Sequence, residues 1–327
     1  MKAKIFVARA IFPEVLERLA QHFDVESNQE DRIYGADELR QKAQGKDGLF
    51  TTPSEPVNAA LFAANPQLKA VCNMAVGYNN IDVAAATAAG VMATNTPEVL
   101  NETTADFAWA LMMATARRIT ESEHWLRAGH WKKWSYDSFT GPDVHGATLG
   151  IIGMGRIGQA IARRSMGFDM NVIYHNRSQL KPELEARANN AKYVGKEELL
   201  RQADHVVLVL PYSKESHHTI AAAELALMKP TATLTNIARG GIVDDAALIQ
   251  TLRTGGIAAA GLDVFENEPA FNPEFLKLSN VVLTPHIASA STPTRLAMAN
   301  CAADNLIAAL AGQTPPNLLN PDVARKG

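Results

Sequence analysis

Three side chains that can do chemistry together follow predicted strands of this sequence. Arg239 ends the run Asn-Ile-Ala-Arg, Glu268 precedes a proline in Asp-Val-Phe-Glu-Asn-Glu-Pro, and His286 lies in Thr-Pro-His-Ile-Ala-Ser. Open α/β sheets bind ligands beyond the carboxyl ends of their strands. Hydride transfer to a 2-keto acid needs a group that binds the carboxylate and polarises the ketone, an acid that protonates the developing alkoxide, and a partner that orients the acid. Arginine, histidine and glutamate can supply these roles, although each of them alone is more often structural.

A glycine-rich turn lies between an apolar run and a helical pattern. The run 149–152 predicts a strand buried on both faces, and it continues into Gly153-Met-Gly-Arg-Ile-Gly158, which fits G-x-G-x-x-G. In this context Gly153 allows a tight turn, Gly155 lets the backbone approach a pyrophosphate, and Gly158 lets the helix pack on the strand. The phosphates would lie at the helix N-terminus, where free N–H groups favour negative charge. The stretch therefore predicts a dinucleotide site.

The next predicted strand bears on the choice between NAD and NADP. An NAD site usually has an acidic side chain at the end of that strand, where it binds the ribose hydroxyls. This strand runs into His175, Asn176, Arg177 and Ser178, with no Asp or Glu. Because arginine pairs well with phosphate, Arg177 and Ser178 favour the 2′-phosphate of NADPH. We expect NADPH as the cofactor and weaker binding of NADH.

Composition excludes several classes of function. The chain has 327 residues, of which 47% are hydrophobic, and this is enough for two domains. Its formal net charge of -3 favours binding to neither nucleic acid nor an anionic membrane. Cys72 and Cys301 are far apart, which suits a reducing compartment. No stretch has the pattern of a signal peptide or a membrane span, and His217 and His218 lack a metal-ligand spacing. We expect a cytoplasmic protein without a metal site.

Short apolar runs alternate with helical patterns, which predicts parallel sheets with helices on both faces. The sheet in residues 1–100 lacks G-x-G-x-x-G, and a second sheet lies in residues 101–289. A last helix, at about residues 292–311, comes after the second sheet is complete, so residues 290–327 should return to the first domain. We expect two doubly wound α/β domains, a Rossmann dinucleotide-binding domain inserted in a flavodoxin-like substrate domain. Strands are predicted at residues 4–8, 48–51, 70–73, 91–93, 149–152, 171–174, 205–210, 233–237, 258–261 and 281–283.

A long helix is predicted to begin at Asn101, a favourable N-cap, and to run to about Arg127. Residues 105–116 are nearly all apolar, so this part should be buried between domains or between subunits. One contact between domains would cover only part of such a surface, which predicts a homodimer. The aromatic segment 129–144, which includes Trp131, predicts a loop that either covers a site or packs on the surface.

Together these motifs closely resemble those of the D-isomer-specific 2-hydroxyacid dehydrogenase family, over nearly the whole chain. The loop that begins Val76-Gly77-Tyr-Asn-Asn belongs to the resemblance. Within the family, the glyoxylate/hydroxypyruvate reductases and 2-ketogluconate reductases are the most similar. The resemblance implies that Arg239 binds the substrate carboxylate and carbonyl, that His286 is the acid/base, and that Glu268 hydrogen-bonds His286. It also implies that the backbone amides of Val76 and Gly77 hold the carboxylate.

The resemblance implies the remaining contacts of the site as well. Arg156 and Ile157 would meet the pyrophosphate, Asp263 the nicotinamide carboxamide, and Thr104 would approach the nicotinamide. Ser289 would contact the substrate. The expected cofactor-binding residues are Thr104, Gly153, Gly155, Arg156, Ile157, Gly158, Asn176, Arg177, Ser178, Leu210, Pro211, Ile237, Asp263 and Ala288.

Two positions depart from the pattern of the family. Asn79 stands where Asp is commoner, and we expect no consequence. Ala288 stands where the family usually has glycine, so its methyl group should narrow the space beside the nicotinamide.

The expected function is NADPH-dependent reduction of a small 2-keto acid, glyoxylate or hydroxypyruvate, to the D-2-hydroxy acid. One alternative is an enzyme with the same chemistry and a different substrate, a 2-ketogluconate reductase. The other alternative is not an enzyme but a regulatory protein that senses NAD(P) on the same fold. The presence of Arg239, Glu268 and His286 speaks against this second alternative. The missing acid after the second strand of the dinucleotide domain disfavours an NAD-dependent phosphoglycerate dehydrogenase.

Overall fold

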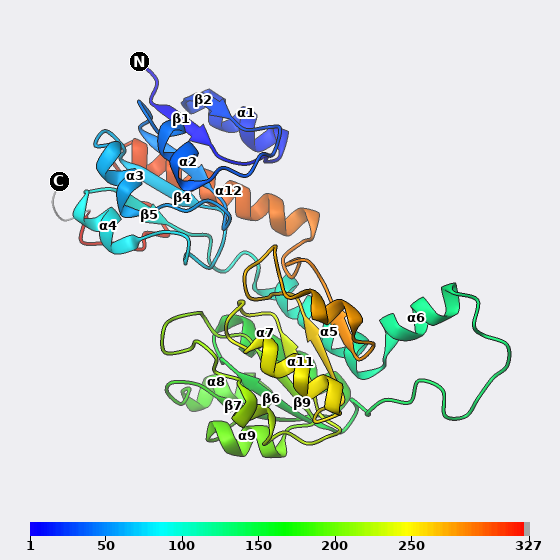
Figure 1. The fold of residues 1–327 in the computed structure, drawn as a ribbon. Coiled ribbons are helices and arrows are strands. Elements are labelled where there is room, and N and C mark those ends of the chain that lie inside the picture. The colour runs from blue at the N-terminus through cyan, green and yellow to red at the C-terminus, as the bar shows by residue number, and fades with distance from the viewer. Residues whose placement is uncertain (324–327) are drawn as a thin grey trace. The chain divides into compact units, whose positions relative to one another are not determined.

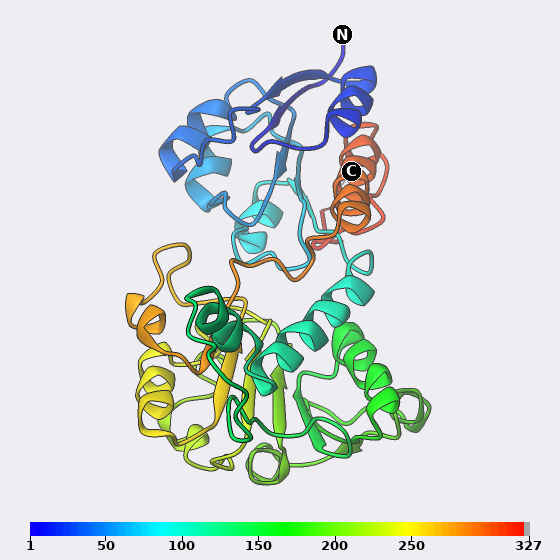
Figure 2. The ribbon, with the colours of Figure 1, turned by 90° about the vertical axis from the view of Figure 1, so that its right-hand side faces the viewer.

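Neighbouring strands are parallel throughout the two sheets of the protein, one of five strands and one of seven. The computed structural model describes residues 1–323 (Figures 1 and 2). Its contacts divide the chain into two units: the first comprises Met1–Leu100 and the described residues from Ala290 onward, and the second is Asn101–Ser289. The expectation of two parallel-sheet α/β domains is confirmed.

The first unit has the strand order β2-β1-β3-β4-β5. Its inner strands are buried on both faces, as parallel strands between two helical layers require. The edge strand β2 is partly exposed and has no apolar run, so the sequence pattern does not predict it. The strands are β1 (Lys4–Val7), β2 (Asp24–Ser27), β3 (Gly48–Thr51), β4 (Ala70–Asn73) and β5 (Met92–Thr94), and the helices are α1 (Pro13–His22), α2 (Ala36–Lys42), α3 (Ala59–Ala64), α4 (Val83–Ala88) and α12 (Thr292–Leu310).

Helix α12 packs on β3 and β4 although it lies far from them in the sequence. Gly48 makes the close approach possible, because a Cβ there would lie 2.8 Å from a methyl group of Leu306. The buried Asn305 donates to Asn95 O at 3.1 Å and accepts from Asn317 N at 3.1 Å. Helix α12 therefore also holds the segment after β5 and the chain beyond its own end.

The second unit has the strand order β12-β11-β10-β9-β6-β7-β8, with helices on both faces of the sheet (Figure 2). None of the helices in the described part of the chain has the length and hydropathy of a membrane span. The strands are β6 (Thr148–Ile152), β7 (Asn171–His175), β8 (Lys192–Tyr193), β9 (His205–Leu208), β10 (Thr233–Asn236), β11 (Ala259–Leu262) and β12 (Val281–Leu283), and the helices are α5 (Asn101–Ala116), α6 (Ile119–Arg127), α7 (Arg156–Arg164), η1 (Ser165–Phe168), α8 (Pro182–Arg187), α9 (Lys196–Gln202), α10 (Ala222–Leu225), α11 (Asp245–Thr254) and η2 (Pro273–Lys277).

The prediction of one helix from Asn101 to Arg127 is wrong, because α5 and α6 are separate helices. Arg118 lies between them with φ of 52°, in the left-handed region that interrupts a right-handed helix. Its guanidinium makes two hydrogen bonds to Glu121 and donates to Thr140 O at 3.2 Å. The break therefore depends partly on a contact with a distant loop.

Helix α5 is buried largely by its own unit. It packs on β10, β11 and α7, and a Cβ at Gly261 would lie 2.4 Å from Thr115 Oγ1, so helix and strand are in direct contact. Trp109 Nε1 donates to Ile161 O at 3.0 Å, and its ring stacks on Phe168. The apolar pattern of α5 is thus explained in large part without a second subunit.

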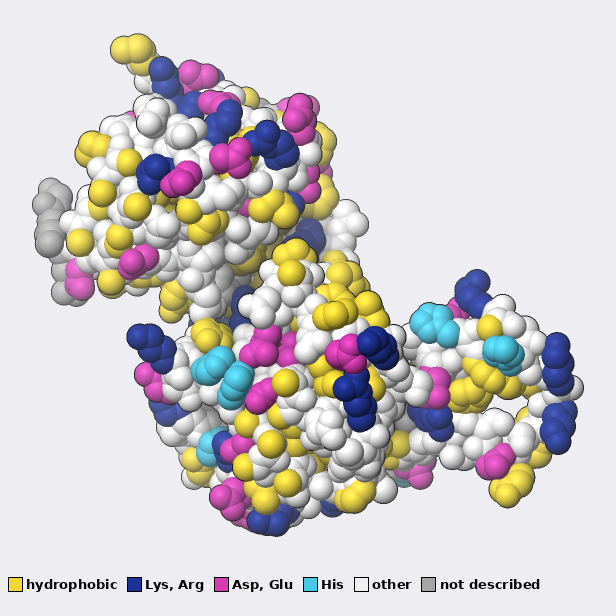
Figure 3. Space-filling view, viewed as in Figure 1, with side chains coloured by type: hydrophobic (Ala, Val, Ile, Leu, Met, Phe, Trp, Pro, Cys, Tyr) yellow, Lys and Arg dark blue, Asp and Glu magenta, His cyan; other side chains and the backbone are white. Residues whose placement is uncertain are grey.

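Helix α6 and the loop after it extend from the body of the second unit (Figure 1). We call residues 119–140 the projecting segment. Its hydrophobic side chains are largely exposed, with Trp131 61%, Trp134 78% and Tyr136 82% exposed. The space-filling view shows hydrophobic and basic side chains together on this segment (Figure 3). These three aromatic side chains therefore do not pack closely on their own chain.

Candidate active site

The loops that carry Arg239, Glu268 and His286 follow three neighbouring strands, β10, β11 and β12. Parallel strands have their carboxyl ends at one edge of a sheet, and ligands of open α/β sheets bind there. The sheet order therefore brings the three predicted side chains to one place.

His286 and Glu268 are hydrogen-bonded to each other. His286 Nδ1 lies 2.8 Å from Glu268 Oε2, and Glu268 Oε1 accepts from Phe265 N at 2.8 Å. Since a carboxylate only accepts, Nδ1 carries the hydrogen and Nε2 remains for a ligand. The side chains of His286 and Glu268 are 38% and 30% exposed, so both are accessible.

Arg239 adds a positive charge beside this pair. Burial lowers the pKa of Arg239, and the charge of Glu268 opposes that shift. Burial also raises the pKa of Glu268, but the hydrogen bond and charge of His286, with smaller contributions from Phe265 N–H and Arg239, bring this pKa below its usual value. Glu268 is therefore an ionised acceptor at neutral pH. The guanidinium of Arg239 also donates to Ala238 O at 2.7 Å.

Asp263 holds the turn that carries His286. Its buried carboxylate accepts from Thr284 Oγ1 at 2.7 Å, Ile287 N at 2.8 Å and Ala288 N at 2.9 Å. Burial raises the pKa of Asp263, and these hydrogen bonds oppose the shift. His286 has φ of 54°, which side chains rarely adopt, and its N–H donates to Asp263 O at 2.9 Å. The contact of Asp263 with a nicotinamide stays a prediction, whereas its support of the turn is observed.

The glycine turn joins β6 to α7. Gly153 has φ of 101°, and a Cβ there would lie 2.8 Å from Leu210 N, so the turn packs on the loop after β9. A Cβ at Gly158 would lie 2.2 Å from Gly153 O, which brings α7 close to the strand end. Any side chain at these two positions would move the backbone. The observed strand–turn–helix is the context that the motif requires.

One observation fits a dinucleotide at this turn, and a second concerns Thr104, a predicted cofactor contact in α5. A Cβ at Gly155 would meet nothing nearby, so there is open space before the N-terminus of α7. Thr104 in α5 is buried, and its hydroxyl has no hydrogen-bond partner among residues 1–323. Arg156 is exposed and Ile157 is half-buried in the first turn of α7.

No acidic side chain follows β7 directly. Gly153 N donates to His175 O at 2.9 Å, which brings the glycine turn to this strand end. Asn176 Nδ2 donates to Ser178 O at 3.2 Å. Arg177 is exposed and makes no hydrogen bond or ion pair with any residue that the structure describes. Its guanidinium is therefore available to an anionic group.

The other predicted contacts lie on the same edge of the second sheet. Leu210 and Pro211 follow β9, and Ile237 follows β10. Leu210 and Ser289 are half-buried, Pro211 is exposed and Ile237 is buried.

Val76 and Gly77 lie in the first unit, on the loop after β4. Their carbonyls accept from Asn95 Nδ2 at 2.8 Å and from Asn73 Nδ2 at 3.0 Å, respectively. Within the described residues, neither of their N–H groups donates a hydrogen bond. The loop is thus held through its carbonyls, and its N–H groups remain for an anion.

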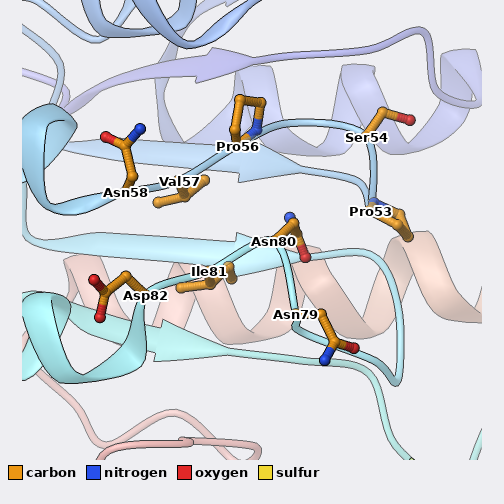
Figure 4. Close-up of a pocket in the computed structure, with 9 residues that line it drawn as sticks. All are labelled: Pro53, Ser54, Pro56, Val57, Asn58, Asn79, Asn80, Ile81 and Asp82. Atoms are coloured by element: carbon orange, nitrogen blue, oxygen red, sulfur yellow. The ribbon is translucent and has the colours of Figure 1, made fainter. Parts of the chain in front are cut away.

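A cavity of about 430 Å³ lies between the chain segments that follow β3 and β4. The sticks of Figure 4 come from these two segments. Asn79 is one of the lining residues. Asn80 Nδ2 donates to Thr52 O and Glu55 O at 3.0 Å, which joins the two segments. The cavity is lined by Pro53, Ser54, Pro56, Val57, Asn58, Asn79, Asn80, Ile81 and Asp82.

Sequence reasoning missed a polar group beside the Glu268 loop. His218, which the sequence analysis weighed only as a metal ligand, lies 2.7 Å from Glu266 Oε1 through its Nε2. The residues are far apart in the sequence and lie on two irregular loops. Only their position beyond neighbouring predicted strands could have suggested the contact.

Comparison with known proteins finds relatives along the whole chain. Residues 109–288 match the model of the D-isomer specific 2-hydroxyacid dehydrogenase, NAD binding domain. The glyoxylate reductase of Thermococcus gammatolerans is 48% identical over 329 residues, which cover 99% of this chain and 98% of the relative. The glyoxylate reductase of Pyrococcus horikoshii is 48% identical over 330 residues, with coverage of 99% and 98%.

Solved structures give the same result. The glyoxylate reductase from Paecilomyes thermophila aligns with a TM-score of 0.87 at 33% identity, over 97% of this chain and 98% of that one. The NADPH-dependent glyoxylate/hydroxypyruvate reductase from Sinorhizobium meliloti, in complex with NADP and malonate, aligns with a TM-score of 0.85 at 34% identity, over 98% and 97%.

Proposed function

Since the chain belongs to the D-isomer specific 2-hydroxyacid dehydrogenase family, we propose that it reduces glyoxylate or hydroxypyruvate to the D-2-hydroxy acid. The observation that carries the proposal is the hydrogen-bonded pair of His286 and Glu268 with the charge of Arg239 beside it. The relatives named glyoxylate reductase support the substrate class.

In this proposal each side chain has one role. Arg239 binds the substrate carboxylate and polarises the ketone, and the N–H groups of Val76 and Gly77 also bind the carboxylate. His286 donates the proton on Nε2 to the oxygen that becomes the hydroxyl. Glu268 orients the imidazole and stabilises its protonated form. When bound, the nicotinamide cofactor supplies the hydride.

We propose NADPH rather than NADH as the preferred cofactor. Arg177 is exposed and has no partner among the described residues, so it can pair with a 2′-phosphate. An NAD-type acidic residue is absent at the end of β7. The Sinorhizobium meliloti relative, which is NADPH-dependent by name, supports this choice. The remaining cofactor contacts are proposed at the residues that surround the glycine turn.

A homodimer is the proposed assembly. The exposed aromatic side chains of the projecting segment offer apolar area that the chain itself does not cover. Light scattering at micromolar concentration should give twice the mass of one chain. A mass equal to that of one chain would contradict the proposal.

The test of the function is NADPH oxidation with glyoxylate as the substrate. Turnover would separate the enzyme from a regulatory protein that binds the dinucleotide without reacting. 2-Ketogluconate in the same assay tests the alternative substrate class. Binding of NADPH without turnover of either keto acid would contradict the proposed function.

A further inference from the structure

His218 and Glu266 form a hydrogen-bonded pair outside the proposed catalytic group. His218 Nε2 lies 2.7 Å from Glu266 Oε1, and the side chains are 33% and 28% exposed. The pair joins the loop after β9 to the loop after β11. On the other side, the ring of His217 stacks on His218 with centroids 3.8 Å apart, and His217 Nδ1 lies 3.2 Å from Tyr212 OH.

The backbone at Phe265 and Glu266 is held on three sides. Glu266 N donates to Asp245 Oδ2 at 3.1 Å, and Phe265 N donates to Glu268 Oε1 at 2.8 Å. A Cβ at Gly240 would lie 1.7 Å from Phe265 O, so the loop after β10 touches this peptide directly. Glu266 is the chain neighbour of Phe265, whose N–H group anchors the Glu268 carboxylate.

We propose that His218 is a positioning residue: by pairing with Glu266 it fixes the backbone that holds Glu268 against His286. The proposal rests on the proposed function, because the orientation of His286 affects the rate only if His286 transfers the proton. His218 itself touches neither Glu268 nor His286 in any hydrogen bond among the described residues.

Other carboxylates lie close to the His218–Glu266 pair. Asp245 lies beside Glu266, and burial raises the pKa of Asp245 to about 6, with further increases from the charges of Glu266 and Asp244 and an opposing effect of His218. Without His218, Glu266 would lose its side-chain hydrogen bond and would be free to turn toward solvent. Among the described residues, His218 contacts Glu266 and His217 and acts on the charge of Asp245; Tyr212 contacts His217, and Asp244 acts on Asp245.

The test compares His218→Ala with His218→Gln, whose amide can still donate to Glu266. Hydrogen exchange is followed in peptides that cover residues 263–270, together with kcat, KM and the pH profile of keto acid reduction. The matched control is His145→Ala, which removes an exposed histidine that lies 3.2 Å from a carboxylate oxygen of Asp169 in the same unit. Should His218→Ala fail to fold, Glu266→Ala removes the same hydrogen bond from the other side and carries the same test.

We expect His218→Ala to speed hydrogen exchange at Phe265 and Glu266 and to lower kcat about tenfold. A misplaced catalytic group can lower the rate by more than this, by about a hundredfold. The reductive activity of His218→Ala should also fade at a lower pH, whereas His218→Gln should stay within about threefold of the parent, since its hydrogen bond persists. Unchanged exchange at Phe265 and Glu266, or a kcat and pH profile equal to the parent's, would overturn the proposal. Equal defects in the Ala and Gln variants would also overturn it.

Hydrogen exchange is measured without a substrate, so it tests the positioning role of His218 separately from the proposed keto acid reduction. If the parent reduces no keto acid, the proposed function fails and His218 loses its place in it. If the parent is active but His218→Ala behaves like His145→Ala, the positioning role alone fails.

Discussion

Nδ1 of His286 lies 2.8 Å from Oε2 of Glu268, and the second carboxylate oxygen of Glu268 is occupied by a backbone N–H. The imidazole is therefore held with Nδ1 protonated and Nε2 directed elsewhere. A histidine in this arrangement can give up a proton at Nε2 while its other nitrogen remains paired.

Replacement of His286 tests its role as the acid. His286→Ala should lower kcat by about 10²–10⁴-fold, the usual contribution of a positioned acid. The dissociation constant of NADPH should change little, because the glycine turn does not depend on this side chain. Stopped-flow kinetics and a fluorescence titration with NADPH measure the two quantities. A variant with nearly full turnover would remove His286 from the mechanism.

Glu268→Gln tests the partner of the acid. The pKa of Glu268 lies below its usual value, so the carboxylate is ionised throughout a neutral assay and stabilises protonated His286. Reduction requires the protonated form and oxidation the neutral one. The variant should therefore lose reductive activity at a lower pH than the parent, while oxidation gains. An identical pH profile of kcat/KM in both proteins would contradict this role.

Arg177→Ala tests the cofactor choice. Loss of a charge-assisted hydrogen bond costs about 1.5–3 kcal/mol, so KM for NADPH should rise roughly ten- to hundredfold. KM for NADH should stay nearly constant, because NADH lacks the 2′-phosphate. Arg201→Ala, at an exposed arginine of α9, is the matched control. Equal losses with both cofactors would assign Arg177 no part in the choice.

Asp245→Asn should stabilise the protein at neutral pH. Burial raises the pKa of Asp245 from 3.8 to about 6, so the folded state holds this proton more tightly than the unfolded state. The protonated carboxyl of Asp245 stabilises the folded state fully at pH values below its pKa in the unfolded protein. This stabilisation is lost as the pH rises through its pKa in the folded protein. The charged form then costs up to about 3 kcal/mol above pH ~6, and asparagine avoids this cost while it still accepts from Glu266 N. Thermal unfolding should show a higher Tm for the variant at pH ~7.5 than for the parent, with little difference at pH ~4; a lower Tm at both pH values would contradict this.

The inner strands of the fold are well predicted because they are buried on both faces. The observed bounds of β3 and β4 are those of the predicted runs 48–51 and 70–73. The edge strands β2 and β8 are polar and paired on one side only, so no apolar run predicts them. The break at Arg118 is also missing from the prediction, since a contact with Thr140 O supports it.

In the candidate site, too, some residues are predicted from the sequence pattern and others are not. Arg239, Glu268 and His286 each follow a predicted strand, so the order of parallel strands suffices to bring them together. The pairing of His218 with Glu266 depends on the paths of two irregular loops, which no periodic pattern describes. Local motifs therefore locate the proposed reacting groups, while the contacts that orient them appear only in three dimensions.

The most direct test of the account is kcat/KM with NADPH for hydroxypyruvate and for pyruvate. Ser289, the proposed substrate contact, offers a hydroxyl to the hydroxyl of hydroxypyruvate. A site that hydrogen-bonds a substrate hydroxyl discriminates against an analogue that lacks it, because its own polar groups are left unpaired. The account predicts D-glycerate as the product, with hydroxypyruvate preferred over pyruvate by more than about tenfold. No turnover of hydroxypyruvate, formation of L-glycerate, or a preference for pyruvate would contradict it.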